Sequence, residues 1–115
     1  MTTYNWSEIA VEQMNALVTR QVIHASSITI ARIALGKGAT VPTHAHINEQ
    51  VLNMISGRLK VILDGAETVL QGGQTLVIPP NIPHSVEALE DVVAVDIFSP
   101  AREDWIRGDD AYLRG

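Results

Sequence analysis

Short runs of alternating polar and apolar residues, divided by turn signals, fill the middle of the chain and restrict the folds open to it. The segments LVTRQVIH (17–24) and SITIARIAL (27–35) are rich in β-branched residues and alternate as strands with one buried face do. Asp64-Gly65 is a strong hairpin signal, and Gly72-Gly73 marks another turn. No long stretch shows the period of a helix. The pattern therefore predicts an all-β fold, either an antiparallel sandwich or a small barrel.

The 115 residues fit one domain, in which we expect about nine strands. The expected strands cover residues 17–24, 27–35, 41–46, 49–56, 58–63, 67–71, 74–79, 84–89 and 91–98. The predicted domain, 1–115, divides into an N-terminal segment, a barrel and a polar tail, at residues 1–16, 17–99 and 100–115. In the N-terminal segment Ser7 can cap a short helix over residues 8–14. In the tail, the sequence REDWIRG is expected to form one helical turn.

Composition and charge exclude several classes of function. The net charge of −5 and the lack of a basic cluster argue against nucleic acid as a partner. Without cysteine, the chain has no disulfide, thiolate zinc site or cysteine nucleophile. The N-terminus lacks the features of a signal peptide, and no run approaches the roughly 18 apolar residues of a membrane span. We therefore expect a cytoplasmic globular protein without a membrane partner.

Three histidines are placed as metal ligands would be. His44 and His46 are two residues apart in an extended segment, so their side chains project to one face, and Gln50 shares their parity. His84 follows the segment PPNIP, whose prolines hold a loop in a rigid conformation. Neutral imidazole is the commonest protein ligand for transition metals. The spacing predicts that the three histidines bind one divalent ion.

The fourth ligand is either Glu49 or Gln50. Carboxylates are the more usual ligands, which favours Glu49, whereas the alternation of a strand favours Gln50. The bend expected at Asn48 weakens the second argument, so both residues stay open on geometry alone, with Gln50 preferred. His24 lies alone in another strand and is interpreted as a structural histidine.

Two segments resemble the two sequence motifs of the cupins. The first comprises Gly38, His44-Ala45-His46, Gln50 and Gly57, and the second comprises Gly73, Pro79, Pro80-Asn81 and His84. In this chain Gln50 stands where the family usually carries glutamate, Asn81 stands where glycine is usual, and Ala88 replaces an asparagine that often ends the second motif. The resemblance implies a single-domain cupin, a β-barrel of the jelly-roll type. It also implies that the metal ligands are His44, His46, Gln50 and His84.

An amide ligand in place of a carboxylate changes the expected chemistry. Three histidines and Gln50 carry no charge, so a divalent ion keeps its full positive charge and acts as a stronger Lewis acid. The set is less suited to the two-histidine, one-carboxylate chemistry of oxygen-activating iron. The donor atoms do not single out one metal, and nickel, manganese, iron, cobalt and zinc all remain candidates.

A strand near the C-terminus and the turn after it hold the second group of candidate residues. Asp96 shares a face with Phe98, opposite a wholly apolar face, and a lone aspartate in such a strand is costly unless it is paired or functional. Arg102 follows a turn and can reach the barrel mouth, where a guanidinium suits a carboxylate. The alternatives are an Asp96 on the solvent face and an Arg102 in a surface ion pair with Glu103 or Asp104.

A closer resemblance covers most of the chain, up to its ending GDDAYL. The segments HxHxxEQ, PPNxPHSxEALED and DxFSPxREDW resemble the KdgF-type cupins of pectin and alginate degradation. Members of that family convert 4,5-unsaturated monouronates into linear, ketonised acids. The resemblance implies that Asp96, Phe98 and Arg102 are the functional residues. We expect Asp96 to shuttle a proton, Arg102 to pair with the substrate carboxylate and Phe98 to supply an apolar wall.

Two other functions stay open. One is a different metal-dependent cupin enzyme, such as a dioxygenase or a sugar isomerase, and the other is a non-enzymatic cupin that binds sugar acids. The departures beside the ligands, Ala45 and Ile47-Asn48, leave open which uronate is preferred. The resemblance also implies a homodimer, since small cupins of this kind often pair through edge strands and N-terminal segments.

Overall fold

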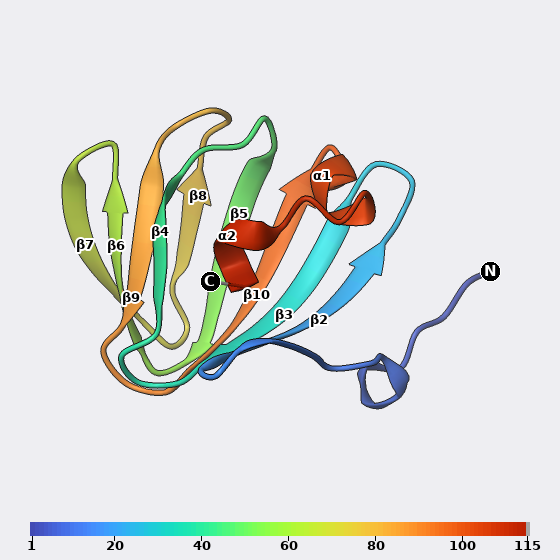
Figure 1. Cartoon of the computed structure of the whole chain (residues 1–115), viewed down its shortest axis with the longest axis horizontal. Helices are drawn as coiled ribbons and strands as arrows, with labels where there is room; N and C mark the ends of the chain where they lie inside the picture. Colours follow the sequence, from blue (N-terminus) through green and yellow to red (C-terminus); the bar gives the residue numbers. More distant parts are fainter. Residues whose placement is uncertain (115) are drawn as a thin grey trace.

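In the computed structural model, which describes residues 1–114, the chain forms two antiparallel sheets that face each other (Figure 1). The larger sheet contains, in spatial order, β1 (Glu12–Asn15), β2 (Val18–His24), β3 (Thr29–Leu35), β10 (Val92–Ser99), β5 (Glu49–Ser56) and β8 (Thr75–Ile78). The smaller sheet contains β4 (Thr40–His44), β9 (His84–Ala88), β6 (Arg58–Leu63) and β7 (Ala66–Gln71). Strands far apart in sequence therefore pair within each sheet, which confirms the all-β, jelly-roll prediction. Gly115, the last residue of the predicted domain, lies outside the described residues.

The N-terminal segment differs from its prediction. The helix expected over residues 8–14 is wrong: a short 3-10 helix spans Trp6–Glu8, and Asn5, not Ser7, caps it through a bond from the Ser7 amide to Asn5 Oδ1. Residues Glu12–Asn15 instead form β1, a tenth strand that pairs with β2. Pairing with an existing strand satisfies the backbone groups of β1 and buries Met14, which outweighs the weak helix signal.

The side chains of β10 show why Asp96 points inward. Val92, Ala94, Asp96 and Phe98 are buried, while the residues between them are only half-buried. The two sheets enclose a core to which β5 and β6 contribute Leu52 and Leu59, among other residues. Asp96 therefore lies inside the barrel, and the alternative of a solvent-facing Asp96 is wrong.

The tail after β10 folds back over the barrel. It forms α1 (Glu103–Ile106), as the sequence predicted, and α2 (Ala111–Arg114), which was not predicted. Trp105 and Leu113 are buried. The tail, although rich in polar residues, therefore packs on the barrel through apolar side chains. In Figure 1 α2 lies in front of the space between β4 and β10. No helix within residues 1–114 is long and apolar enough to cross a membrane.

A buried ion pair fastens this tail to the first strands. Asp110, which is 3% exposed, accepts bonds from Arg20 on β2 at 2.8 Å and from Arg114 on α2 at 3.0 and 3.2 Å. Arg20 also forms two bonds of 3.0 Å with Glu12 on β1. Asn15 adds a bond to the Leu113 carbonyl at 3.1 Å. The position of α2 thus depends on charged groups contributed by β1 and β2.

Replacing Asp110 with asparagine is expected to destabilise the protein by about 2 kcal/mol at pH 7, because Arg20 loses a buried charged partner. Hydrogen bonds from Arg114 and, to a smaller extent, from Arg20 hold the pKa of Asp110 below 3.8, although burial of the carboxylate acts in the opposite direction. A lowered pKa contributes stability above the unfolded pKa and loses it as the pH falls. Urea unfolding of both proteins should show the difference shrinking below pH 3.8. A difference that stays constant between pH 7 and pH 3 would contradict this role of the carboxylate.

Gly57, at the sharp turn between β5 and β6, tolerates no side chain. Its φ is +89°, and an added Cβ would lie against the Asp91 carbonyl oxygen, far inside contact distance. Gly38 offers a matched control, since its φ is +88° but an added Cβ would meet nothing within 4 Å. We expect Gly57→Ala to lower the free energy of unfolding by at least about 3 kcal/mol, and Gly38→Ala by only about 1 kcal/mol. Equal losses in denaturant titrations would show that the backbone conformation alone matters.

Candidate metal centre and active site

The smaller sheet and the loop between β4 and β5 bring three histidines together at one end of the barrel. His44 ends β4, His84 begins β9, and the two residues are direct partners in the pairing of these strands. His46 lies two residues further, in the loop before β5. One nitrogen from each ring lies within 4.8 Å of the others. The structure thus assembles the histidine trio that the spacing predicted.

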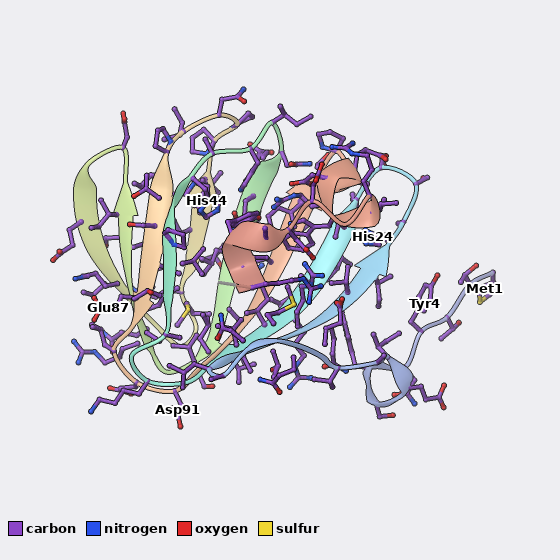
Figure 2. All side chains as sticks on the ribbon, viewed as in Figure 1. Met1, Tyr4, His24, His44, Glu87 and Asp91 are labelled. Atoms are coloured by element: carbon purple, nitrogen blue, oxygen red, sulfur yellow. The ribbon has the colours of Figure 1, made fainter. Side chains whose placement is uncertain are left out.

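The fourth histidine lies elsewhere. Figure 2 shows His24, the last residue of β2, well away from His44. Its ring is exposed, and its Nδ1 lies 2.8 Å from Thr29 Oγ1. A ring with a local partner on the outside of the fold agrees with the structural interpretation of His24.

Backbone carbonyls orient all three rings of the trio. The Nδ1 atoms of His44, His46 and His84 lie 2.7, 3.0 and 2.8 Å from the carbonyl oxygens of Pro42, Asn48 and Ile82. A carbonyl can only accept a hydrogen bond, so each Nδ1 carries the proton. The lone pair of each neutral ring is then on Nε2, the atom left to bind a metal. The loop residues beside the histidines therefore select the tautomer that metal ligation needs.

Gln50 completes this arrangement from β5. Its Nε2 donates to Asp96 Oδ1 at 3.0 Å, which turns its Oε1 toward His46 Nε2 at 3.1 Å. Both of the latter atoms present lone pairs, and two acceptors at that distance repel unless a cation lies near both. Glu49, the alternative ligand, is exposed and on the other face of the strand. The structure therefore places Gln50, not Glu49, with the histidines.

A buried, unpaired nitrogen gives the second sign that a cation fits here. Among the described residues, His84 Nε2 is one of two buried side-chain polar atoms with no hydrogen-bond partner. Leaving such an atom without a partner costs about 1–3 kcal/mol. Burial lowers the pKa of His44 and of His46 to about 4, and it also lowers the pKa of His84. All three rings are thus neutral near pH 7, which is the form that binds a metal.

Asp96 lies directly behind Gln50, on the neighbouring strand β10. It is 6% exposed, and burial raises its pKa to about 6, although the bond from Gln50 and the charge of Arg102 act in the opposite direction. A carboxyl group with a pKa near neutrality can both accept and donate a proton at physiological pH. Asp96 is therefore suited to proton transfer and is linked to the histidine trio through a single amide.

Arg102 reaches the same cavity from the start of the tail. Its guanidinium lies 4.7 Å from the centre of the Phe98 ring and 4.2 Å from that of Trp105, and the side chain is 1% exposed. Asp104 accepts from its Nε and Nη2 at 2.9 and 2.8 Å. The alternative ion pair with Asp104 therefore exists, but it lies at the barrel mouth, where the Arg102 side chain is buried and that of Asp104 is 30% exposed. The aromatic rings and Asp104 fix the guanidinium in one orientation.

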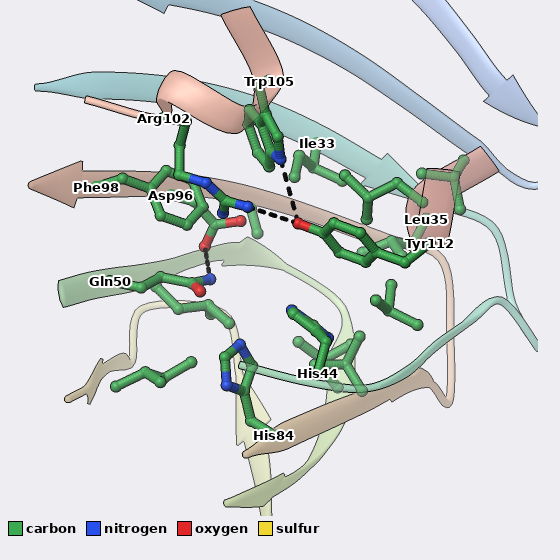
Figure 3. Close-up of a pocket in the computed structure, with 18 residues that line it drawn as sticks. Ile33, Leu35, His44, Gln50, His84, Asp96, Phe98, Arg102, Trp105 and Tyr112 are labelled. Carbon is green, nitrogen blue, oxygen red and sulfur yellow. Dashed lines mark hydrogen bonds between the residues drawn. The ribbon is translucent and has the colours of Figure 1, made fainter. Parts of the chain in front are cut away.

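Two residues at this site were not singled out by the sequence reasoning. Trp105 packs on Arg102 and on Phe98, with ring centres 5.1 Å apart in the second pair. Tyr112, on α2, accepts hydrogen bonds from Arg102 and Trp105 (Figure 3). The only sequence signal for Tyr112 was its place in the ending GDDAYL, which carries no periodicity.

Most of these side chains, though not His46 or Asp104, line one cavity of about 60 Å³. Its lining combines aliphatic core residues with the polar and aromatic side chains of His44, Gln50, His84, Asp96, Phe98 and Arg102. Such a volume holds an ion and a few water molecules. His44 and His46 are partly exposed, so a larger ligand can approach the site from the barrel mouth.

Comparison with known families agrees with this geometry. The profile of the family described as "Cupin domain" matches residues 31–98, which is more than half of the chain and includes all of the histidines of the trio. The chain is a cupin. The match covers the segment from β3 to β10 and leaves the tail with Arg102 and Tyr112 outside it.

Individual relatives narrow the comparison. This cupin is 29% identical, over 98 residues, to the pectin degradation protein KdgF of Dickeya dadantii, covering 83% of this chain and 89% of that protein. The crystal structure of an RmlC-like cupin from Shewanella frigidimarina superimposes with a TM-score of 0.85 at 28% identity, over 91% of this chain and 96% of that chain. The structure of KdgF from Halomonas sp. gives a TM-score of 0.85 at 25% identity, over 91% and 98% of the two chains. This cupin is thus KdgF-like in sequence and in fold.

Proposed function

We propose that this cupin is a metal-dependent enzyme that opens the ring of 4,5-unsaturated uronic acid monosaccharides and releases the linear, ketonised acid. The observation that carries the proposal is the link from His46 through Gln50 to Asp96, with the fixed guanidinium of Arg102 at the same cavity. This arrangement combines a site for a Lewis acid, a proton carrier and a carboxylate partner. Similarity to KdgF proteins, one of them named for pectin degradation, supports the substrate class.

The metal would be held by the Nε2 atoms of the three histidines and by Gln50 Oε1. The unpaired His84 nitrogen and the facing lone pairs of His46 and Gln50 are the observations that fit this role. Nickel, manganese, iron, cobalt and zinc all suit a set of three imidazoles and one amide. A divalent ion bound there supplies Lewis-acid stabilisation of negative charge on a substrate oxygen.

Asp96 carries the proton in the proposed reaction. The substrate is a cyclic hemiacetal whose ring oxygen is joined to C5 of a C4=C5 double bond. As carboxylate, Asp96 removes the proton of the anomeric hydroxyl, the bond between C1 and the ring oxygen breaks, and an aldehyde and an enolate form. As carboxylic acid, Asp96 then returns the proton to C4, and the enolate becomes a ketone. No atom is gained or lost, and the carboxylate is regenerated.

Arg102 and Phe98 position the substrate in this scheme. The guanidinium of Arg102 pairs with the C6 carboxylate, and its fixed orientation reduces the entropy lost on binding. Phe98 lies beside Arg102 and 5.6 Å from the ring centre of His46, where it supplies an apolar surface for the sugar. The proposed substrate is a small acidic sugar. Although the net charge of the protein is −5, Arg102 gives the site a local positive charge that can bind an anion.

Proton NMR in deuterium oxide tests the proposal. The protein should convert 4,5-unsaturated galacturonate into the linear keto acid faster than the solvent reaction, with one deuterium delivered at C4. Consumption of oxygen during the reaction would point instead to a dioxygenase. Binding of the uronate with no acceleration would point to a sugar-acid-binding protein. Either result would overturn the proposed enzymatic role.

We also propose a homodimer in the cytoplasm, and an apolar row on the larger sheet supports the pairing. Cross-strand partners on its outer face form the row Ile23, Ile30, Ile97, Val51 and Val77. Two copies can bury such a row against each other, as isologous dimers do. Val51→Glu should convert a dimer into a monomer in sedimentation experiments, whereas Val69→Glu, an exposed position on β7, should not. A wild-type protein that sediments as a monomer would contradict the proposal.

A further inference from the structure

Tyr112 lies at the barrel mouth, directly against the histidine trio. It belongs to α2, and its ring packs on that of His44 with centres 4.6 Å apart and an angle of 31° between the planes. Its hydroxyl oxygen accepts from Arg102 Nη2 at 2.7 Å and from Trp105 Nε1 at 3.2 Å. The phenol is thus held at three points, by one imidazole and two donors.

These contacts leave the hydroxyl proton of Tyr112 unused. A guanidinium and an indole N–H can donate but cannot accept, so neither partner takes that proton. Within residues 1–114, no other group accepts a hydrogen bond from the Tyr112 hydroxyl. Two donors that point at one oxygen polarise it and make the remaining O–H a stronger donor. The hydroxyl is therefore prepared to donate to a ligand.

The direction of this donor follows from the groups around the cavity. Tyr112 and Asp96 both line it, and Figure 3 shows Asp96 with Gln50 on one side of Arg102 and Tyr112 on the other, above His44. An anion that pairs with the guanidinium would meet the Tyr112 hydroxyl at the same time. A carboxylate has two oxygens with several lone-pair positions and can accept from both donors at once.

We propose that Tyr112 contacts the substrate and donates a hydrogen bond to the carboxylate of the bound sugar acid, next to Arg102. The substrate class in this inference rests on the proposed function. Removing the hydroxyl takes away one hydrogen bond to a charged group, and this weakens binding by about tenfold or more. Tyr112→Phe keeps the ring on His44, so the protein should retain its fold and its metal content.

Calorimetric titration with galacturonate tests this contact, because the saturated sugar keeps the carboxylate and ring but lacks the reacting double bond. Three metal-loaded proteins are compared: the wild type, Tyr112→Phe and Tyr4→Phe, whose tyrosine is 54% exposed on the N-terminal segment. The Kd should rise about tenfold or more for Tyr112→Phe and stay unchanged for Tyr4→Phe. Equal affinity in all three proteins, or no binding by the wild type, would overturn the assignment.

A purely positioning role for Tyr112 makes a different prediction. If Tyr112 only held Arg102 in place, Arg102→Lys, which keeps the positive charge but removes the guanidinium that Tyr112 holds, would abolish the effect of Tyr112→Phe in the double variant. A direct contact instead leaves a further loss of affinity when Tyr112 is replaced in that background. The absence of a further loss would contradict the direct contact.

The inference and the proposed function can fail separately. A protein that binds galacturonate through Tyr112 but does not accelerate opening of the unsaturated uronate would overturn the proposed reaction and support the contact. A protein that accelerates the reaction, but whose Tyr112→Phe variant binds galacturonate with wild-type affinity, would overturn only the contact.

Discussion

Asp96→Asn is expected to slow the ketonisation of 4,5-unsaturated galacturonate by about 10²- to 10³-fold. The side chain is buried inside the barrel, and burial raises its pKa to about 6, so the native carboxyl can accept a proton and return it. Asparagine has nearly the same shape and can still accept the bond that Gln50 donates. It cannot carry a proton. The loss should therefore appear in kcat, with KM changed little.

The controls for this variant separate chemistry from structure. Metal content and the unfolding transition should match those of the wild type, because the amide keeps the contact with Gln50. Asp91→Asn, an exposed aspartate away from the site, should leave kcat unchanged. If Asp96→Asn turned over at the wild-type rate while binding metal normally, the assignment of Asp96 as proton carrier would be wrong.

His84→Ala is expected to lower metal affinity by more than about 100-fold. Loss of a residue that only hydrogen-bonds to a metal ligand costs about 10- to 100-fold, and loss of the ligand itself should cost more. His84 presents a buried Nε2 without a protein partner and is fixed by the Ile82 carbonyl. Alanine removes one of four donors from the site. Metal analysis after dialysis against a competing chelator, together with calorimetric titration of the apo protein, would measure the loss without reliance on turnover.

Glu49 and Gln50 provide a matched pair for the same measurement. The two residues are adjacent on β5, but Gln50 is 7% exposed beside His46, whereas Glu49 is exposed on the opposite face. Gln50→Ala should weaken metal binding, and Glu49→Ala should leave it unchanged. If His84→Ala kept its metal, or if Glu49→Ala lost it, the proposed ligand set would be wrong.

Alternation was the strongest guide to this fold, because a barrel strand must separate inward from outward side chains. The parity of Asp96 with Phe98 favoured a place inside the barrel, and the parity of Gln50 with the histidines favoured it over Glu49, while the alternative to each stayed open until the structure placed both side chains. The expected helix over residues 8–14 failed because β1 is stabilised by pairing with β2 and by burial of Met14, neither of which is visible locally. For short segments, long-range pairing outweighs local propensity.

The tail shows the limit of sequence reasoning most clearly. Its α2 helix has four residues, too few for a periodic signal, and its position depends on Asp110 and its partner Arg20, which are 90 positions apart. The residues of α2 could therefore not be placed over the barrel mouth in advance. Arg102 was expected either at the cavity or in an ion pair with a neighbouring acid. The structure shows both, because Asp104 also lies at the barrel mouth and can pair with Arg102 while the guanidinium stays buried at the cavity.

An absorbance assay tests the central claim most directly. The conjugated enol ether of 4,5-unsaturated galacturonate absorbs in the ultraviolet, and its absorbance is lost when the ring opens and the ketone forms. Metal-loaded protein should accelerate this loss well above the solvent rate, chelator-treated protein should return it to that rate, and added metal should restore it. A chelator-treated, metal-free protein that is as active as the loaded one, or a loaded protein that never exceeds the solvent rate, would contradict the account.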